Sequence, residues 1–332
     1  MISVVGPVYN ESEGIALFHE RLSKTLKGLG LPYEIIYVND GSRDNTLEVL
    51  RSFRRNDPHV KIVDFSRNFG HQLAITAGMD HAAGDACIVI DTDGQDPPEL
   101  IPKLVEAWQQ GNQVVYAVRT RREGETWFKL LTAAMFYRLM RRITTVDIPL
   151  DAGDFRLVDR RVLDVLREMR ETHRFVRGLT SWAGYKQTKV EYPRAERAFG
   201  ETNYPLVKML RFALDGITAF SHAPLRWVTM FGLAVFSLSL AVGAWVVWVR
   251  LFNDRAVQGW ASLMVIVLFM GGANLIAMGV IGEYLARIFD EVKRRPLYVV
   301  REAAGFTAGP RPDAAAPGTI QPPSRGAAPA RG

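Results

Sequence analysis

Two aspartates and a glutamine stand at alternate positions directly after a short apolar run, a spacing that suits a bound divalent cation. Asp91, Asp93 and Gln95 follow residues 87–90. Two carboxylates this close repel each other unless something cationic lies between them. Mg²⁺ and Mn²⁺ prefer such oxygen ligands and leave positions open for diphosphate oxygens. The alternative is that these side chains only cap the following helix, but the pattern favours a cation site.

Further polar side chains stand where other apolar runs end. Tyr9 and Glu11 lie at the end of the first run, Asp40 follows the second, and Arg119 follows the fifth. Asp40 can accept hydrogen bonds from a base N–H or a ribose hydroxyl, and Tyr9 can stack on a base. Taken singly, Asp40 also fits an ordinary turn and Tyr9 a half-buried strand residue. Together they indicate a nucleotide site.

These residues need a scaffold that brings the ends of several strands together. Short apolar runs, rich in β-branched residues, alternate with amphipathic segments. The runs cover residues 2–9, 34–39, 61–65, 87–90 and 114–118, and the amphipathic segments cover 13–29, 45–55, 70–83 and 98–110. This alternation predicts an α/β fold with a doubly wound, mostly parallel sheet. Ligands of such sheets bind at the carboxyl ends of the strands, where the polar residues stand.

Composition and motifs exclude several classes of protein. The 332 residues are 48% hydrophobic and 23% charged, so the chain is neither disordered throughout nor collagen-like. A single cysteine, Cys87, rules out an intramolecular disulfide framework and a cysteine-built zinc site. No G-x-G-x-x-G or G-x-x-x-x-G-K-[ST] motif supports a dinucleotide oxidoreductase or a P-loop NTPase. The net charge of +6 suits phosphate or an anionic membrane surface, and no motif supports nucleic acid.

Two uncharged stretches near the C-terminus predict a transmembrane hairpin. Residues 228–249 hold no charge over 22 positions, and residues 256–282 hold none over 27. A pair of buried core helices is the alternative, but helices of this length, with tryptophans near their ends, favour membrane spans. Eight basic residues in the flanks against two in the turn predict that both flanks face the cytoplasm. The N-terminus lacks the basic start of a signal peptide.

The sequence therefore predicts five regions. An α/β domain covers residues 1–200, an interfacial amphipathic helix 201–227, and two transmembrane helices 228–286, at about 228–250 and 257–283. A cytoplasmic juxtamembrane segment covers 287–302, and a tail rich in Ala, Pro and Gly covers 303–332 and is expected to be disordered. Residues 127–143 also carry basic and apolar residues at helical spacing, which favours a helix at the membrane surface.

Four motifs in this order and spacing resemble glycosyltransferase family 2, which has the GT-A fold. They are VYNE, VNDGSRDNT, FSRNFG and DTDGQDPPEL. The later stretches R-x-R-R-x-G-E-T and DAGDFRL, with the two apolar segments, are similar to the polyprenyl-phosphate glycosyltransferases. That group includes dolichol-phosphate mannose synthase and bactoprenol glucosyltransferases. The resemblance covers roughly residues 1–300.

The resemblance implies a role for each matching position. It implies nucleotide-sugar contacts at Pro7, Tyr9, Glu11, Asp40, Asp91 and Arg197, and lipid-phosphate contacts at Arg119, Arg122, Lys129 and Thr202. It implies metal ligands at Asp91, Asp93 and Gln95, and a catalytic role for Asp154. Three positions depart from the family pattern: Asn203 replaces a lysine, Gly94 a common leucine, and His71-Gln72 stands where a lysine is common.

The implied reaction is an inverting transfer of a hexose from a nucleotide diphosphate sugar to undecaprenyl phosphate, with Mg²⁺ or Mn²⁺ as cofactor. UDP-glucose is the first choice of donor, and GDP-mannose or a UDP-aminosugar remains open. Asp154 is expected to orient groups more than to take a proton, because a lipid phosphate is already largely dianionic. The resemblance also implies a homo-oligomer, a tetramer, at the cell membrane. A non-catalytic scaffold that binds nucleotide sugar is the alternative from another class.

Overall fold

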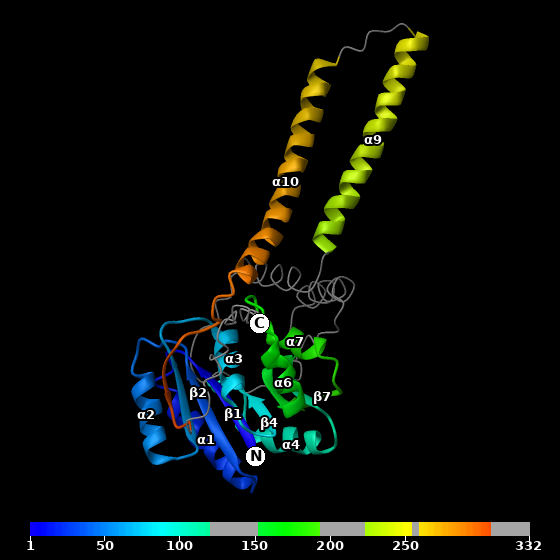
Figure 1. Ribbon diagram of the computed structural model, residues 1–332. Helices are drawn as coiled ribbons and strands as arrows, with labels where there is room; N and C mark the ends of the chain where they lie inside the picture. The colour runs from blue at the N-terminus through cyan, green and yellow to red at the C-terminus, as the bar shows by residue number, and fades with distance from the viewer. Residues whose placement is uncertain (120–151, 193–222, 254–258, 307–332) are drawn as a thin grey trace, which may run out of the picture.

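The computed structural model describes residues 1–119, 152–192, 223–253 and 259–306 (Figure 1). Within these residues, eight strands form one sheet in the order β7-β5-β6-β4-β1-β2-β3-β8. The strands are β1 (Ile2–Val8), β2 (Tyr33–Asn39), β3 (Val60–Phe65), β4 (Ala86–Val89), β5 (Val114–Arg119), β6 (Ala152–Asp159), β7 (Gln187–Tyr192) and β8 (Val300–Ala304). The mostly parallel α/β sheet expected from the sequence is confirmed, with two additional antiparallel strands.

The parallel part of the sheet positions the polar residues at strand ends. β1 pairs in parallel with both β2 and β4, and β2 pairs in parallel with β3. The carboxyl ends of these strands therefore meet at one edge. β6 lies antiparallel between β4 and β5, so the residues at its start reach the same edge.

Alternating apolar residues divide the core into two layers, one on each face of the sheet. Val4 and Ile35 pack with α1 (Ile15–Gly28), α2 (Thr46–Asn56) and α4 (Ile101–Gln109), which follows the 3₁₀ turn Pro98–Leu100. The next residue on each strand, Val5 and Ile36, packs on the opposite face with α3 (His71–His81), α6 (Arg160–Glu168) and α7 (Val176–Trp182). The period of two residues explains why these strands are apolar throughout: both faces are covered.

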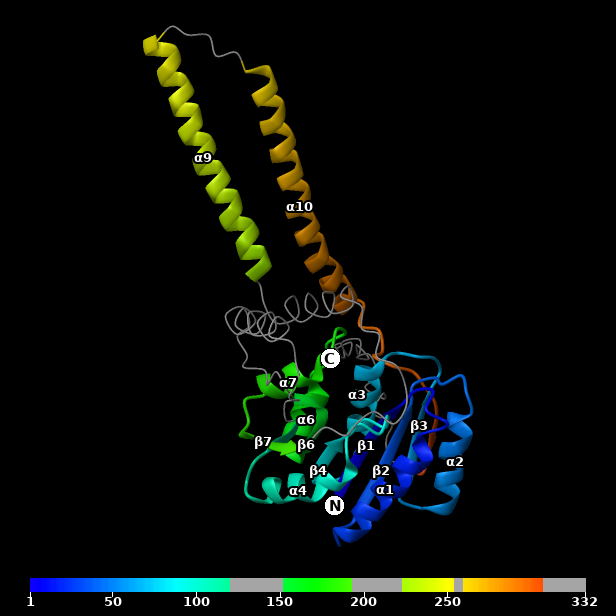
Figure 2. The same cartoon turned by 180° about the vertical axis from the view of Figure 1, so that it is seen from behind.

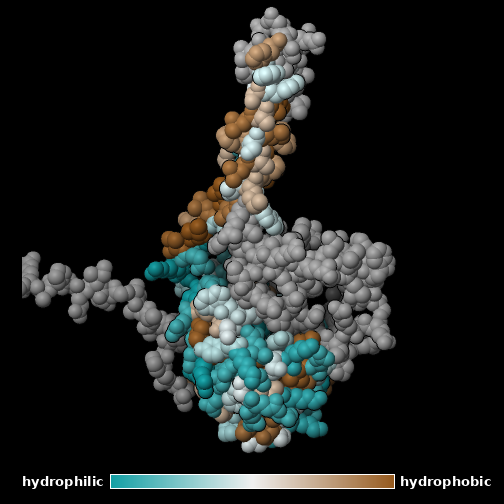
Figure 3. All heavy atoms as spheres, turned by 90° about the vertical axis from the view of Figure 1, so that its right-hand side faces the viewer, coloured by the Kyte–Doolittle hydropathy of each residue, from teal (hydrophilic) through white to brown (hydrophobic). Residues whose placement is uncertain are grey.

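Two long helices extend from one end of the domain. They are α9 (Ala223–Asn253) and α10 (Trp260–Val292), of 31 and 33 residues. Both are long and apolar enough to cross a membrane, and large apolar side chains such as Phe236 and Leu275 are exposed along them (Figure 3). α10 ends nine residues beyond the boundary expected at 283, because it continues through polar residues such as Glu283 and Arg287, which pair one turn apart.

The chain returns to the sheet after α10, which corrects the expected start of the tail. β8 pairs antiparallel with β3 and crosses the expected boundary between residues 302 and 303, so Ala303 and Ala304 belong to the sheet. The physical reason is a buried carboxylate on β3: Arg301 Nε donates to Asp64 Oδ2 at 2.7 Å. Tyr298 also stacks on Phe65, with ring centroids 5.1 Å apart.

Candidate active site

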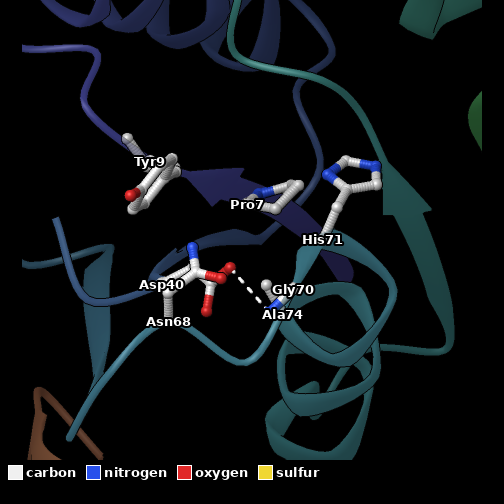
Figure 4. A pocket seen from close by; sticks show the side chains of 8 residues that line it. Pro7, Tyr9, Asp40, Asn68, Gly70, His71 and Ala74 are labelled. Carbon is white, nitrogen blue, oxygen red and sulfur yellow. Dashed lines mark hydrogen bonds between the residues drawn. The ribbon is translucent and has the colours of Figure 1, made fainter. Parts of the chain in front are cut away.

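The site lies at the carboxyl edge of the sheet, where β1, β2 and the start of α3 surround a pocket. The pocket has a volume of about 210 Å³ and is lined by Pro7, Val8, Tyr9, Asp40, Asn68, Gly70, His71 and Ala74 (Figure 4). Tyr9 is exposed at its mouth, and His71 stands on the far side, at the first turn of α3. Three residues expected at a nucleotide site, Pro7, Tyr9 and Asp40, are therefore brought together.

Asp40 holds the loop that forms one wall of this pocket. Its Oδ1 accepts from the backbone N–H of Phe69 at 2.7 Å, and its Oδ2 from that of Gly70 at 3.0 Å. Burial raises the pKa of Asp40, although these two hydrogen bonds oppose the rise. Gly41 follows with a φ of 66°, and a Cβ there would lie 2.4 Å from the carbonyl carbon of Arg67. Asp40 thus shapes the pocket by fixing its loop as well as by lining it.

The three expected metal ligands lie together at the end of β4. Asp93 accepts from both the backbone N–H and the side-chain amide of Gln95. Asp91 Oδ1 is buried and, among the described residues, accepts no hydrogen bond, although His71 Nε2 lies 3.4 Å away. Burial raises the pKa of Asp91 to about 7, and the charges of Asp154, Asp96 and Asp93 add to the rise.

A buried carboxylate oxygen that lacks a hydrogen bond fits a site for a hard cation. Glu11, at the end of β1, supports this fit: burial raises its pKa, and the charge of Asp93 raises it further. Acidic side chains that follow β1 and β4 thus lie close enough for the charge of Asp93 to raise the pKa of Glu11. In the described part of the chain, no group of three or more His, Cys, Asp or Glu side chains could hold a metal alone. Diphosphate oxygens would complete the coordination.

Asp154, on β6, is in contact with hydrogen-bonding groups from two elements, α3 and α7. Arg177 of α7 makes a two-pronged contact, Nε to Oδ1 at 2.8 Å and a terminal nitrogen to Oδ2 at 3.1 Å. His71 Nε2 and the Gln72 amide nitrogen, both in the first turn of α3, lie 3.2 and 3.3 Å from Oδ2. Burial alone would raise the pKa of Asp154. Hydrogen bonds from His71 and Arg177 and the charges of Arg177 and Arg156 instead hold it far below its usual range.

His71 contacts both the expected metal ligand Asp91 and the expected catalytic residue Asp154. Its ring lies between Asp91 and Asp154, and its side chain is 45% exposed, so it also faces the pocket. Burial alone would lower the pKa of His71, but the hydrogen bond to Asp154 and the charge of Asp91 raise it overall. The sequence marks His71 and Gln72 only as departures from a family pattern. Arg177 carries no sequence signal, because it lies 23 residues after Asp154 in an amphipathic segment.

The remaining expected site residues lie at the limit of the described residues or outside them. Arg119 is the last residue of β5, where it pairs in register with Tyr192 of β7. Arg122, Lys129, Arg197 and Thr202, the departure at Asn203, and the expected helices at 127–143 and 201–227 up to residue 222 lie outside the described residues. Their roles stay predictions.

Known proteins match this chain over most of its length. The model of the family "Glycosyl transferase family 2" matches residues 3–167. A Bacillus subtilis protein named "Uncharacterized glycosyltransferase YkcC" is 53% identical over 304 residues, which are 92% of this chain and 94% of the relative. The "SfII prophage-derived bactoprenol glucosyl transferase" of Shigella flexneri is 43% identical over 302 residues, 91% of this chain and 98% of the relative.

Among solved structures, mannosyl-3-phosphoglycerate synthase from Rubrobacter xylanophilus is similar with a TM-score of 0.48 and 17% identity. The match covers 70% of this chain and 75% of that one. The mixed sheet, with its carboxylates at the end of β4, is the GT-A arrangement expected from the sequence motifs. Because relatives that are 53% and 43% identical match over nine-tenths of this chain, the chain is a glycosyltransferase and belongs to glycosyltransferase family 2.

Proposed function

We propose that this chain transfers a hexose, with UDP-glucose as the first choice of donor, to a polyprenyl phosphate such as undecaprenyl phosphate. The observation that carries the proposal is the convergence of Asp91, Asp93 and Asp154 at one sheet edge, on the side from which α9 and α10 extend. The N-terminus, where β1 begins, lies at the opposite end of the domain in both ribbon views (Figures 1 and 2). The carboxyl end of β1 thus points toward the apolar helices.

The acceptor is proposed from the relatives and from this placement. The Shigella flexneri relative is named a bactoprenol glucosyl transferase, and the match spans nearly all of it. A phosphate on a long lipid lies at the headgroup level of a membrane. A catalytic edge that faces two membrane-length helices is in the right place to meet it. The glucosyl part of the same name supports glucose, and the resemblance of the DAGDFRL stretch supports UDP-glucose over GDP-mannose or a UDP-aminosugar.

The proposed reaction is a single displacement. An oxygen of the lipid phosphate attacks the anomeric carbon, and the bond from that carbon to the nucleoside diphosphate breaks, which inverts the anomeric centre. A phosphate monoester with a second pKa of about 6 is largely dianionic near neutral pH, so no strong base is needed. The depressed pKa of Asp154 fits this: its carboxylate is a weak base and a fixed negative charge. We assign Asp154 to orienting groups and stabilising the cation-like sugar.

Asp91, Asp93 and Gln95 are proposed to hold a divalent cation, Mg²⁺ or Mn²⁺. When bound, such a cation offsets the negative charge that develops on the leaving nucleoside diphosphate. Pro7, Tyr9, Glu11 and Asp40 are proposed to contact the nucleotide, together with Arg197. Arg119, Arg122, Lys129 and Thr202 are proposed to contact the lipid phosphate. We further propose a homo-oligomer in the cell membrane, with both termini and the catalytic domain in the cytoplasm.

A reconstituted transfer assay tests the proposal. The purified chain, with undecaprenyl phosphate, Mg²⁺ or Mn²⁺ and UDP-glucose, is expected to form a lipid-linked glucose with inverted configuration, detected by mass spectrometry and NMR. A panel with GDP-mannose and UDP-aminosugars identifies the preferred donor. No lipid-linked product with any donor would contradict the acceptor, and a retained configuration would contradict the single displacement.

The variant Asp93→Ala separates an enzyme from a scaffold. This substitution removes one proposed metal ligand. Because the side chain of Asp93 is exposed, the fold should tolerate the change. Transfer is expected to fall by about 10²-fold or more, with the oligomeric state unchanged in light scattering. Full transfer by Asp93→Ala at limiting Mg²⁺ and Mn²⁺ would show that Asp93 is not a ligand of the cation.

A further inference from the structure

The end of α10 contacts a loop of the catalytic domain far from it in sequence. This loop, residues 169–175, joins α6 to α7. The backbone N–H of Thr172 donates to Glu291 Oε1 at 2.7 Å, and His173 Nε2 lies 3.3 Å from Asp290 Oδ2. Asp290 and Glu291 belong to the last turn of α10, so the membrane-length helix holds this loop directly.

The chain that follows α10 reaches the same loop by a second route. Tyr298 donates its hydroxyl hydrogen to Asp80 Oδ2 at 2.7 Å, and Arg170 donates to the same oxygen at 2.7 Å. The side chain of Asp80 is only 2% exposed, so this shared acceptor is a fixed point at the end of α3. The loop is thus attached to the α10 segment both through Thr172 and His173 and through Arg170.

The loop itself is stiffened and leads at once into the active site. The guanidinium of Arg174 is buried and donates to the backbone carbonyls of Met169 and Leu166, so the loop is closed onto the end of α6. Two residues later α7 begins. The backbone N–H of Val176 donates to Gln72 Oε1 at 3.0 Å, and Arg177 makes its two contacts with Asp154.

We propose that Asp290 and Glu291 are positioning residues: through Thr172 and His173 they hold α7 so that Arg177 stays in register with Asp154. The second helix of the hairpin is then part of the support of the active site and not only an anchor. A shift of α10 relative to the domain would displace His173, and the chain would transmit this displacement over four residues to Arg177. Because Arg177 contacts Asp154 at two atoms, a small displacement of α7 removes one contact of the pair.

Hydrogen exchange measured by mass spectrometry on the full chain in detergent micelles tests the structural link. Glu291→Ala removes the acceptor of the Thr172 N–H, and exchange is expected to rise about tenfold in residues 170–182. Peptides from β1 and β2 should keep their protection. Glu291→Gln keeps a carbonyl oxygen at the acceptor position and should restore protection. Glu283→Ala is the matched control, because Glu283 pairs with Arg287 of the same helix.

Unchanged exchange in residues 176–182 of Glu291→Ala would overturn the proposal. An equal rise in Glu283→Ala would overturn it as well, because it would show a general loosening of α10. This measurement needs no substrate and therefore does not depend on the proposed function.

Kinetics on the same proteins tests whether the link reaches the chemistry, and this arm rests on the proposed function. With UDP-glucose and undecaprenyl phosphate as probes, Asp290→Ala/Glu291→Ala is expected to lower kcat about three- to tenfold, with the Kd of UDP unchanged. In an Arg177→Lys background, which keeps the cation but not the two-pronged contact, the same double change should add little.

An equal loss of kcat in both backgrounds would overturn the proposal, and so would an effect confined to the KM of the lipid. If the unaltered chain transfers no sugar to undecaprenyl phosphate, the proposed function fails, while the exchange experiment still decides the positioning role.

Discussion

Asp154 is a carboxylate whose charge is fixed by its surroundings. Arg177, His71, Gln72 and Arg156 approach it from three elements, and the side chain is only 7% exposed. A carboxylate in such a position neither gains a proton near neutral pH nor moves freely. In the proposed reaction, it would therefore present a constant negative charge to a sugar that becomes positive as its bond to the diphosphate breaks.

Asp154→Asn is expected to lower transfer by about 10²- to 10³-fold in the reconstituted assay, because it removes this charge while keeping the shape. Arg177 and His71 would also lose their partner, so a fall in stability of about 2–4 kcal/mol is expected in urea unfolding at pH 7. Near wild-type turnover in Asp154→Asn would end any essential role for this residue.

The pH dependence of stability follows from the same depressed pKa. The native carboxylate of Asp154 stays ionised at a pH below the ordinary pKa of an aspartate, whereas in the unfolded chain it takes up a proton at about pH 3.9. Its contribution to stability is therefore present above that pH and is lost as the pH falls toward the pKa of the folded state. The unfolding free energy of Asp154→Asn should depend less steeply on pH below about 4 than that of the unaltered chain.

Gly41 and Gly30 form a matched pair for testing the pocket wall. Both have positive φ, 66° and 65°, but a Cβ at Gly41 would meet the backbone of Arg67 and Asn68, whereas one at Gly30 would meet nothing within 4 Å. Gly30→Ala should cost only about 1–2 kcal/mol of stability, with nucleotide binding unchanged. Gly41→Ala should also displace the loop that Asp40 holds and weaken UDP binding about tenfold or more in calorimetry. Equal UDP affinities in the two variants would contradict this.

Single residues were predictable where backbone periodicity places them. Asp40, Asp91 and Asp93 follow apolar strands, so their meeting at one edge follows from parallel pairing. Asp154 came only from the family resemblance, because its run DAGDFRL does not look like a parallel strand. Arg177 was not predictable: its contact with Asp154 depends on the packing of α7 against α6 and on the hydrogen bond from Val176 to Gln72, which no local pattern encodes.

At the scale of elements, the sequence did not predict that β6 and β8 are strands or that they run antiparallel to their neighbours. β6 runs antiparallel between β4 and β5, although all five expected strands alternate with helices. β8 has the sequence VREAA, with two charged residues in five, and lacks an apolar alternation. Residues 300–304 form a strand because β3 offers backbone groups for pairing and the buried carboxylate of Asp64. Both depend on the tertiary structure and not on the local sequence.

Truncation separates the contribution of β8 from that of the tail. Ending the chain after residue 296 would remove the ring of Tyr298 from Phe65 and leave Asp64 without Arg301, so we expect the melting temperature of the domain to fall by several degrees. Ending it after residue 306 should leave the melting temperature unchanged, because the Ala-, Pro- and Gly-rich composition beyond cannot bury a core. Differential scanning calorimetry in detergent compares the two, and equal melting temperatures would contradict the role of β8.

At the scale of the whole molecule, the apolar helices lie on the same side of the domain as the carboxyl end of β1, where the candidate site is (Figures 1 and 2). The exposed side chains of α9 and α10 are largely hydrophobic, while the described residues on the face of the domain seen in Figure 3 are mainly hydrophilic. This division was predictable from the two uncharged stretches alone, because uncharged stretches of this length can be recognised in the sequence without any knowledge of the tertiary structure. How α10 joins the domain was not, since it depends on the contacts of Asp290 and Glu291 with a distant loop.

Fusion reporters test the proposed topology. A fluorescent protein attached after residue 332 should be bright, because that end is expected in the cytoplasm, and alkaline phosphatase at the same position should be inactive. Alkaline phosphatase inserted after Asn253, at the end of α9, should be active. The opposite pattern would reverse the orientation, and chain recovered without detergent in the soluble fraction would contradict membrane insertion.

The return of the chain from α10 into β8 means that the domain is joined to the helical hairpin at two places instead of one. A body on a single tether can swivel, whereas one on two tethers loses most of that freedom when the chain folds. Under the proposed membrane placement, the reactive edge then keeps a constant height and tilt above the bilayer. Part of the rotational entropy of docking onto a lipid that diffuses in two dimensions would then be lost when the chain folds, before any lipid arrives.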